Sequence, residues 1–251
     1  MLLTGKVVLI SGAGRNNGKA ISLKFAEEGA DLVLVARERE AELNAVVQQC
    51  EERGAKVLAI LADATDPADV ARLTQAALDR FGRIDAAINV IGLRQHAPAL
   101  EISFADWQQA FAVNVHAFFL LAQAVAPQMV ERGSGSLVAL GGMAAMRPQI
   151  YGSSVVASKH ALYGLVKSLA LELSPHGVRV NLLNPGHIEN IRANPEWYAK
   201  EGGRPLANLD EVPLRRMGKN AEVANVAAFL ASDMSSYVTG DRIMCVGGRW
   251  M

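Results

Sequence analysis

Short apolar segments alternate along this chain with longer segments of helical period, and this alternation restricts the fold more than any other feature. Seven segments have the length and apolar content of buried strands: 6–11, 31–36, 56–62, 86–90, 136–140, 179–184 and 241–246. Segments 19–28, 38–53, 68–81 and 157–173 repeat apolar residues at helical spacing. Strands that alternate with helices form right-handed βαβ units. The sequence therefore predicts an α/β fold, a doubly wound parallel sheet of the Rossmann type with about seven strands.

The chain is predicted to form a single domain over residues 1–251, since no repeat, low-complexity tract or linker interrupts it. Asp66 and Pro67 have the pattern of a helix start, with proline at the first helical position. The one long irregular stretch is 186–213, which is rich in proline and glycine. A loop of this length in a compact domain is typical of a substrate lid. The lid residues Trp197, Tyr198 and Leu206 suggest a substrate with an apolar part.

Composition excludes several kinds of partner. The 25 basic and 25 acidic residues cancel, so neither nucleic acid nor a membrane surface is an expected partner. Cys50 and Cys245 fit no metal-ligand or disulfide pattern, which predicts no metal site and a reducing, cytoplasmic location. Residues 1–10 lack the features of a signal peptide. Residues 107–130 carry no formal charge and could span a bilayer by length, but their glutamines, asparagine, histidine and proline predict a buried helix instead.

The first predicted strand runs into a glycine-rich turn at residues 11–18, before a helix expected to begin near Lys19. Glycines in such a turn let the backbone approach a pyrophosphate, whose charge is favoured at the helix N-terminus. A glycine-rich turn alone is a weak signal, and a tight turn without a ligand is the alternative. Between the first strand and first helix of a doubly wound chain, it predicts a dinucleotide site.

This turn resembles the Thr-Gly-x-x-x-Gly-x-Gly motif of the short-chain dehydrogenase/reductase family, which Ser11, Gly12 and Gly18 match. Asn16 replaces the middle glycine. Because asparagine tolerates a positive φ better than most residues, we expect the turn to keep its shape. Asn17 stands where the family usually has a hydrophobic residue near the nicotinamide.

Further matches to the family follow in order along the whole chain. Residues 89–92 resemble the Asn-Asn-Ala-Gly motif, Asn114 matches the family's helix asparagine, and 184–188 resemble the Pro-Gly motif beside the nicotinamide. Asp63 resembles the residue that contacts adenine. Asn190 stands where the family often has a threonine that binds the carboxamide. The resemblance and the turn together give these expected cofactor-binding residues: Gly12, Arg15, Asn16, Asn17, Gly18, Arg37, Asp63, Asn89, Gly92, Lys159, Pro185, Gly186, Ile188 and Asn190.

Two arginines favour NADP(H) over NAD(H) as the cofactor. Enzymes of this fold that prefer NAD place an acidic residue at the end of the second strand, where it binds the ribose 2′-hydroxyl. That position is Ala36, and Arg37 follows it, while Arg15 lies in the glycine-rich turn. Two guanidinium groups suit a 2′-phosphate in charge and geometry. The alternative is that both arginines are solvated surface residues.

The resemblance also implies a proton-transfer set, and part of it is missing. In the family, a tyrosine four residues before the lysine exchanges a proton with the substrate, and a serine about thirteen residues earlier binds the substrate. The lysine lowers the tyrosine's pKa and binds the ribose, and the asparagine holds a water. Here Val155 and Gly142 occupy the tyrosine and serine positions, while Asn114 and Lys159 remain. Losing a general acid typically costs about 10²–10⁴ in rate, so the usual carbonyl-reductase mechanism is not expected.

Other side chains could replace the missing donor. Tyr151 lies eight residues before Lys159, and His187 follows the Pro-Gly motif; these two are the best candidates. His96 lies after the fourth predicted strand, near the expected substrate cleft. Ser153 and Ser154 are expected to cap the following helix.

Two functions remain open from the sequence. The first is an NADP(H)-dependent oxidoreductase with a non-classical or missing proton donor, which reduces an activated C=C bond or a carbonyl group. The second is a catalytically inactive cofactor-binding protein that acts as a sensor or partner subunit. The resemblance implies a homotetramer, since the family pairs the helices that match 111–130 and 157–173, which are apolar all round here.

Overall fold

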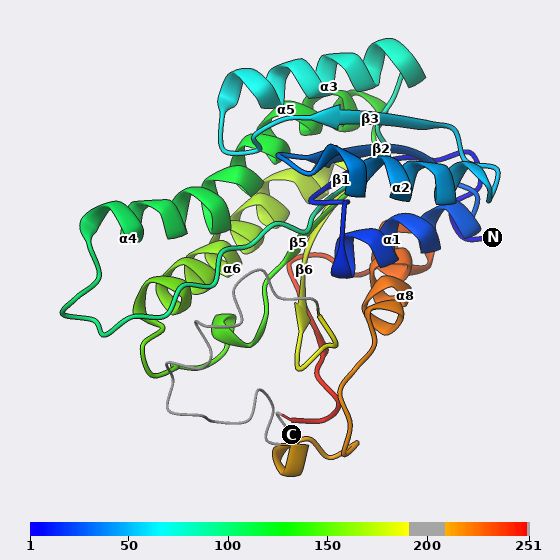
Figure 1. Cartoon of the computed structure of the whole chain (residues 1–251). Coiled ribbons are helices and arrows are strands. Elements are labelled where there is room, and N and C mark those ends of the chain that lie inside the picture. The colour runs from blue at the N-terminus through cyan, green and yellow to red at the C-terminus, as the bar shows by residue number, and fades with distance from the viewer. Residues whose placement is uncertain (191–208, 250–251) are drawn as a thin grey trace.

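Seven parallel strands form a single sheet in the order β3-β2-β1-β4-β5-β6-β7 (Figure 1). The computed structural model describes residues 1–190 and 209–249. Because every neighbouring pair is parallel, all carboxyl ends lie at one edge, and the order reverses between β1 and β4. Ligands of doubly wound sheets bind at that reversal. The strands are β1 (Val7–Ser11), β2 (Asp31–Ala36), β3 (Val57–Leu61), β4 (Ala86–Asn89), β5 (Gly135–Leu140), β6 (Val178–Pro185) and β7 (Arg242–Cys245).

Helices cover both faces of the sheet (Figure 1). α1, α2 and α8 pack on one face, α3, α5 and α6 pack on the other, and α4 lies beside α6. The α-helices are α1 (Asn16–Glu27), α2 (Glu40–Glu51), α3 (Pro67–Phe81), α4 (Phe104–Phe111), α5 (Ala117–Arg132), α6 (Ser153–Leu173) and α8 (Asn220–Ala231). Shorter turns are the π-helix η1 (Ala112–His116) and the 3-10 helices η2 (Met143–Ala145), η3 (Ser174–His176), η4 (Leu209–Glu211) and η5 (Asp233–Ser235).

Each central strand is buried on both sides. Along β1, Val8 and Ile10 belong to the core beneath α1 and α8, whereas Val7 and Leu9 belong to the core beneath α3 and α5. Successive side chains of a strand point to opposite faces, so a sheet covered on both faces needs continuous apolar strands. The predicted doubly wound α/β fold is confirmed.

Most element boundaries agree with the sequence prediction, with two informative differences. β2 coincides with the predicted segment, and Asp66 caps α3 by accepting a hydrogen bond from Ala68 N. α1 begins at Asn16, three residues before the expected start, and α6 begins at Ser153, four residues before it. The expectation that Ser153 and Ser154 cap α6 is wrong, because Gly152 is the capping residue and both serines are already helical.

The uncharged segment around 107–130 forms a helix packed within the fold, as predicted. α4, η1 and α5 make one continuous helical run, Phe104–Arg132, which is long and apolar enough to cross a membrane by composition alone. In α5, however, Phe118, Leu121 and Val125 are buried in the core beneath the sheet. The apolar content is therefore that of a helix packed against the sheet.

Candidate active site

The glycine-rich turn between β1 and α1 has the shape of a phosphate cradle. Gly12 N and Ala13 N donate to Val35 O at 2.8 and 3.0 Å, which fixes the start of the turn against β2. A Cβ atom on Gly18 would lie well under 3.0 Å from Gly12 O, so only glycine fits there. Asn16 has a φ of +48°, which confirms that asparagine takes the positive-φ position of the turn. The turn thus leads directly into the N-terminus of α1, where an anion is favoured.

Three buried side-chain oxygens lie around this turn and the end of β4. Ser11 and Asn89 are paired residues of β1 and β4 at the carboxyl edge, and Asn17 lies in the first turn of α1. Ser11 Oγ, Asn17 Oδ1 and Asn89 Oδ1 are buried and have no hydrogen-bond partner among the described residues. A buried polar atom without a partner costs about 1–3 kcal/mol. Residues of this chemistry fit a polar ligand, such as a dinucleotide, across β1 and β4.

Arg37 and Asp63, two of the residues expected at the adenosine end of the cofactor, lie beside each other. Arg37, directly after β2, forms an ion pair with Glu38 at 2.8 Å and lies 3.9 Å from Asp63 Oδ2. Asp63 Oδ1 accepts from Thr65 N and Thr65 Oγ1 at 2.8 and 2.7 Å. Arg15 immediately precedes α1 in extended backbone. The guanidinium of Arg37 is therefore exposed at the expected edge, with two carboxylates beside it.

Asn114 links the loop after β4 to α6 through hydrogen bonds. It is buried in the π-helical turn η1. Asn114 Oδ1 accepts from Leu93 N at 2.9 Å, and Asn114 Nδ2 donates to Leu93 O at 3.1 Å and to Ser158 Oγ at 2.9 Å. Both amide protons are thereby used within the protein, so the side chain holds the position of the loop. Ser158 was not predicted as a site residue; its place beside Lys159 was the only sequence signal.

Lys159 provides a buried amine at the ends of β4 and β5. It lies one helical turn after Val155 on α6, and its Nζ donates to Leu140 O at 2.9 Å. Burial, followed by the nearby charge of Arg94, lowers the pKa of Lys159 from 10.5 to about 8. A Cβ atom on Gly92 would lie 3.3 Å from Lys159 Nζ, so Gly92 and the amine are adjacent. Val155 is buried on the same face and offers no proton.

Gly142, at the expected serine position, is hydrogen-bonded to an asparagine from β6. Gly142 has a φ of +122° with ψ near 180°, a conformation almost restricted to glycine. Its N–H donates to Asn184 Oδ1 at 2.9 Å, and Asn184 is fully buried. Asn184 Nδ2 also lies 3.5 Å from Met244 Sδ. From the sequence, Asn184 is placed at the start of the Pro-Gly motif but is assigned no role in the site.

The Pro-Gly motif ends β6 and turns toward β7. Pro185 is the last residue of β6, and Gly186 N donates to Cys245 O at 2.9 Å. Ile188 is buried and forms an isolated bridge with Gly218. Asn190 Nδ2 donates to Ile188 O at 3.0 Å. Residues 191–208, which contain most of the predicted lid with Trp197, Tyr198 and Leu206, lie outside the described residues.

The two candidate substitute donors occupy different parts of the site. Tyr151 lies before α6 with a φ of +59°, its carbonyl accepts from Ala97 N at 2.9 Å, and it is about half exposed. His187 is half-buried, and its carbonyl accepts from Gly218 N at 2.8 Å. His96 is half-buried in the loop after β4.

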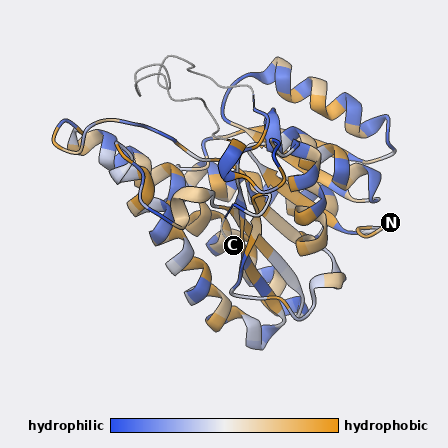
Figure 2. Ribbon diagram, turned by 90° about the horizontal axis from the view of Figure 1, so that it is seen from below, coloured by the Kyte–Doolittle hydropathy of each residue, from blue (hydrophilic) through white to orange (hydrophobic). Residues whose placement is uncertain are grey.

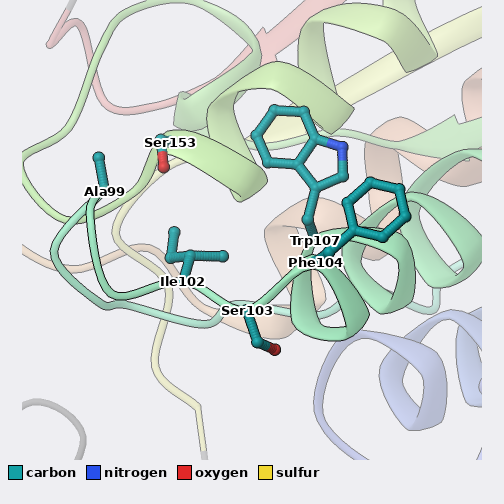
Figure 3. Close-up of a pocket in the computed structure, with 6 residues that line it drawn as sticks. All are labelled: Ala99, Ile102, Ser103, Phe104, Trp107 and Ser153. Atoms are coloured by element: carbon teal, nitrogen blue, oxygen red, sulfur yellow. The ribbon is translucent and has the colours of Figure 1, made fainter.

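A shallow apolar cavity of about 370 Å³ lies between α4 and the start of α6 (Figure 3). A second cavity of about 250 Å³ shares Ala99 and Ser153 with it and includes Tyr151. None of the residues lining the first cavity is a predicted catalytic or cofactor-binding residue. The lining of the first is Ala99, Ile102, Ser103, Phe104, Trp107 and Ser153.

Comparison with known proteins covers nearly the whole chain. Residues 12–249 match the family described as Enoyl-(Acyl carrier protein) reductase. The 3-oxoacyl-[acyl-carrier-protein] reductase FabG of Thermotoga maritima is 35% identical over 248 residues, which are 99% of each protein. The crystal structure of levodione reductase is similar with a TM-score of 0.93 at 32% identity, over 98% of each chain. NAD+-bound xylitol dehydrogenase has a TM-score of 0.91 at 30% identity, over 99% of this chain and 100% of that one.

These similarities extend over both the sheet and the site, from the glycine-rich turn to the Pro-Gly motif. The glycine-rich turn from Gly12 onward, the buried lysine and the Asn114 contacts all lie within the matched residues. The chain belongs to the short-chain dehydrogenase/reductase family, a family of oxidoreductases that bind a nicotinamide cofactor.

Proposed function

We propose that this protein is an NADP(H)-dependent oxidoreductase that works without the family's tyrosine, on a carbonyl group or an activated C=C bond of a small molecule. The observation that carries the proposal is that the family's helix asparagine and lysine are retained together at one cleft: Asn114 is linked to Ser158, and the buried amine of Lys159 donates to Leu140 O. Burying an ammonium group costs free energy of folding, and buried groups with a shifted pKa cluster at functional sites. The retained amine therefore supports a working cleft.

The chain's own residues suggest how the cofactor and substrate are held. A nicotinamide cofactor, when bound, would supply or accept the hydride. The turn from Gly12 to Gly18 would hold its pyrophosphate at the N-terminus of α1, and Lys159 would bind its ribose. Val155 and Gly142 supply no hydroxyl group, so the proton comes from water or from Tyr151 or His187. Hydride addition to an activated C=C bond suits such a site, since water can protonate the resulting enolate.

A second candidate is a cofactor-binding protein without hydride chemistry, acting as a sensor or partner subunit. Val155 and Gly142 favour it, because the proton-transfer groups are replaced while the phosphate cradle remains. Lys159 does not separate the two functions, since ribose binding requires it in both. Turnover of enones or ketones with bound cofactor separates them.

We infer a preference for NADP(H) from Arg37 and Arg15. Both arginines lie at the edge where the adenosine ribose binds in this fold, and no acidic residue occupies the end of β2. Glu38 and Asp63 lie beside Arg37 and offset part of its charge. These exposed pairs contribute little on their own, so a 2′-phosphate can replace them as the partner of Arg37.

The first experiment is a titration of NADPH and NADH into the wild type and Arg37→Ala. We expect micromolar NADPH affinity that falls by about tenfold in the variant, with little change for NADH. Arg53→Ala is the matched control, because Arg53 is an exposed arginine paired with Glu27 at the far end of α2. Binding of neither nucleotide would contradict both candidate functions.

A homotetramer and a cytoplasmic location complete the proposal. Phe119 and Leu171, on the outer faces of α5 and α6, are exposed, and Ala161 and Gly164 leave room for a close helix contact. Cys50 and Cys245 are free thiols, as expected in a reducing compartment. The mass in solution, measured by light scattering, tests the assembly.

A further inference from the structure

Two arginines from distant parts of the chain meet one carboxylate beside the Gly142 loop. Arg249, in the tail after β7, donates Nη2 to Glu211 of η4, and its Nη1 lies 3.7 Å from Met143 Sδ. Arg147, after η2, lies 3.6 Å from Glu211 Oε2. The Arg249 side chain is only 9% exposed, whereas Arg147 and Glu211 are about half exposed. We call Arg147, Glu211 and Arg249 the arginine pair site.

The arginine pair site lies at the same loop as the proposed reaction centre. Met143 directly follows Gly142, and Leu140, two residues earlier, accepts the hydrogen bond from Lys159. Figure 1 shows the C-terminal tail and η4 together below the carboxyl edge of the sheet, where β5 leads into η2. Figure 2, seen from below, shows hydrophilic segments close to the C-terminus on this side. A substrate at the end of β5 would therefore approach both guanidinium groups.

We propose that the arginine pair site binds a carboxylate group of the substrate, and that Glu211 occupies it in the substrate-free protein. Guanidinium groups bind carboxylates through paired, charge-assisted hydrogen bonds. Glu211 already shows that a carboxylate fits between Arg147 and Arg249. Arg94 adds another positive charge to the cleft, close enough to act on Lys159. The subsite serves the oxidoreductase proposed above and makes its substrate an oxo acid or an unsaturated acid.

The proposal predicts that substitutions of Glu211 and of the two arginines change the affinity for a carboxylate in opposite directions. The probe is propionate, with propionamide as its uncharged counterpart, and binding is followed by ligand-observed NMR with and without NADPH. Glu211→Gln removes the competing charge, so propionate should bind at least about tenfold more tightly than to the wild type. Arg147→Gln and Arg249→Gln should weaken propionate binding by a similar factor.

The controls separate this site from general electrostatics and from the proposed function. Asp210→Asn removes the neighbouring carboxylate, which pairs with Arg215 instead, and should leave propionate affinity unchanged. Arg147 is half exposed, so we expect Arg147→Gln to fold. This variant therefore tests the site even if Arg249→Gln does not fold. The proposal is overturned if propionate binds the wild type and Glu211→Gln with the same affinity. It is also overturned if propionamide binds as tightly as propionate. A failure of NADPH binding is seen in a separate titration and counts against the proposed function alone.

Discussion

Asn184 occupies the space that a side chain at residue 141 would need. A Cβ atom on Gly141 would lie well under 3.0 Å from Asn184 Oδ1, and the same oxygen accepts a hydrogen bond from Gly142 N at 2.9 Å. Two glycines and one buried asparagine thus form a single unit at the end of β5. The glycine at the expected serine position is therefore held by a buried side chain from the neighbouring strand β6.

Adding a side chain at residue 141 should destabilise the protein through Asn184. We expect Gly141→Ala to lower the free energy of unfolding by about 1–3 kcal/mol, the usual cost of overpacking. In an Asn184→Ala background the same change should cost clearly less, because the opposing oxygen is gone. Urea unfolding of the four proteins forms a double-mutant cycle. Equal penalties in both backgrounds would show that Leu182, the other neighbour of Gly141, sets the cost.

Restoring the family's serine at residue 142 should strain the backbone. Gly142 has a φ of +122°, and a non-glycine residue in such a region costs about 1–3 kcal/mol. We expect Gly142→Ser to lower the free energy of unfolding by that amount. Ala45→Ser is the control, because Ala45 is exposed on α2, away from the helices proposed to pair in the tetramer. A wild-type stability for Gly142→Ser would mean that the loop adopts another conformation.

The buried amine of Lys159 should make stability depend on pH. Its pKa of about 8 in the folded state lies below the 10.5 of an ordinary lysine. Between these values the unfolded chain binds more protons, so folding becomes more favourable as pH rises. From pH 7 to 10, the wild type should gain about 2 kcal/mol relative to Lys159→Met. Chemical denaturation across this range measures the difference.

Lys167→Met is the control for that titration, since Lys167 is exposed on the same helix. We expect its stability relative to the wild type to stay constant between pH 7 and 10. If Lys159→Met behaves in the same way, Lys159 is not desolvated as the structure describes.

Removing the Asn114 amide should loosen the loop after β4. Asn114→Ala loses three hydrogen bonds, two of them to Leu93, and should lower the free energy of unfolding by about 1–3 kcal/mol. NADPH affinity should fall as well, because Gly92 lies next to Leu93 and against Lys159. The exposed Asn44 of α2 provides a control in Asn44→Ala. Lower stability with unchanged NADPH affinity would mean that the loop does not contribute to the cofactor site.

The strands of the sheet could be predicted from the sequence because they are buried on both faces and therefore form continuous apolar segments. The run from Asp31 to Ala36 is apolar apart from its first residue, so its limits are visible without tertiary information. The start of α1 was placed too late, because Asn16 combines a turn conformation with the first helical position. Helical periodicity gives no signal for such a residue.

The site was less predictable where contacts join distant segments. The glycine-rich turn could be read locally, and the positive φ of Asn16 followed from the chemistry of asparagine. The Asn184 contact links residues 42 positions apart, and the Asn114–Ser158 contact links residues 44 apart. No local pattern marks either pair. Tertiary packing alone brings them together.

The Gly141–Asn184 relationship also joins the two strand ends that border the proposed reaction centre. One oxygen of Asn184, held in β6, both accepts from Gly142 N and fills the space beside Gly141. A serine at residue 141 would have to displace that oxygen, and a serine at residue 142 would have to change the positive φ there. Rebuilding the family's serine in this protein therefore calls for changes in β6 as well as in the loop after β5.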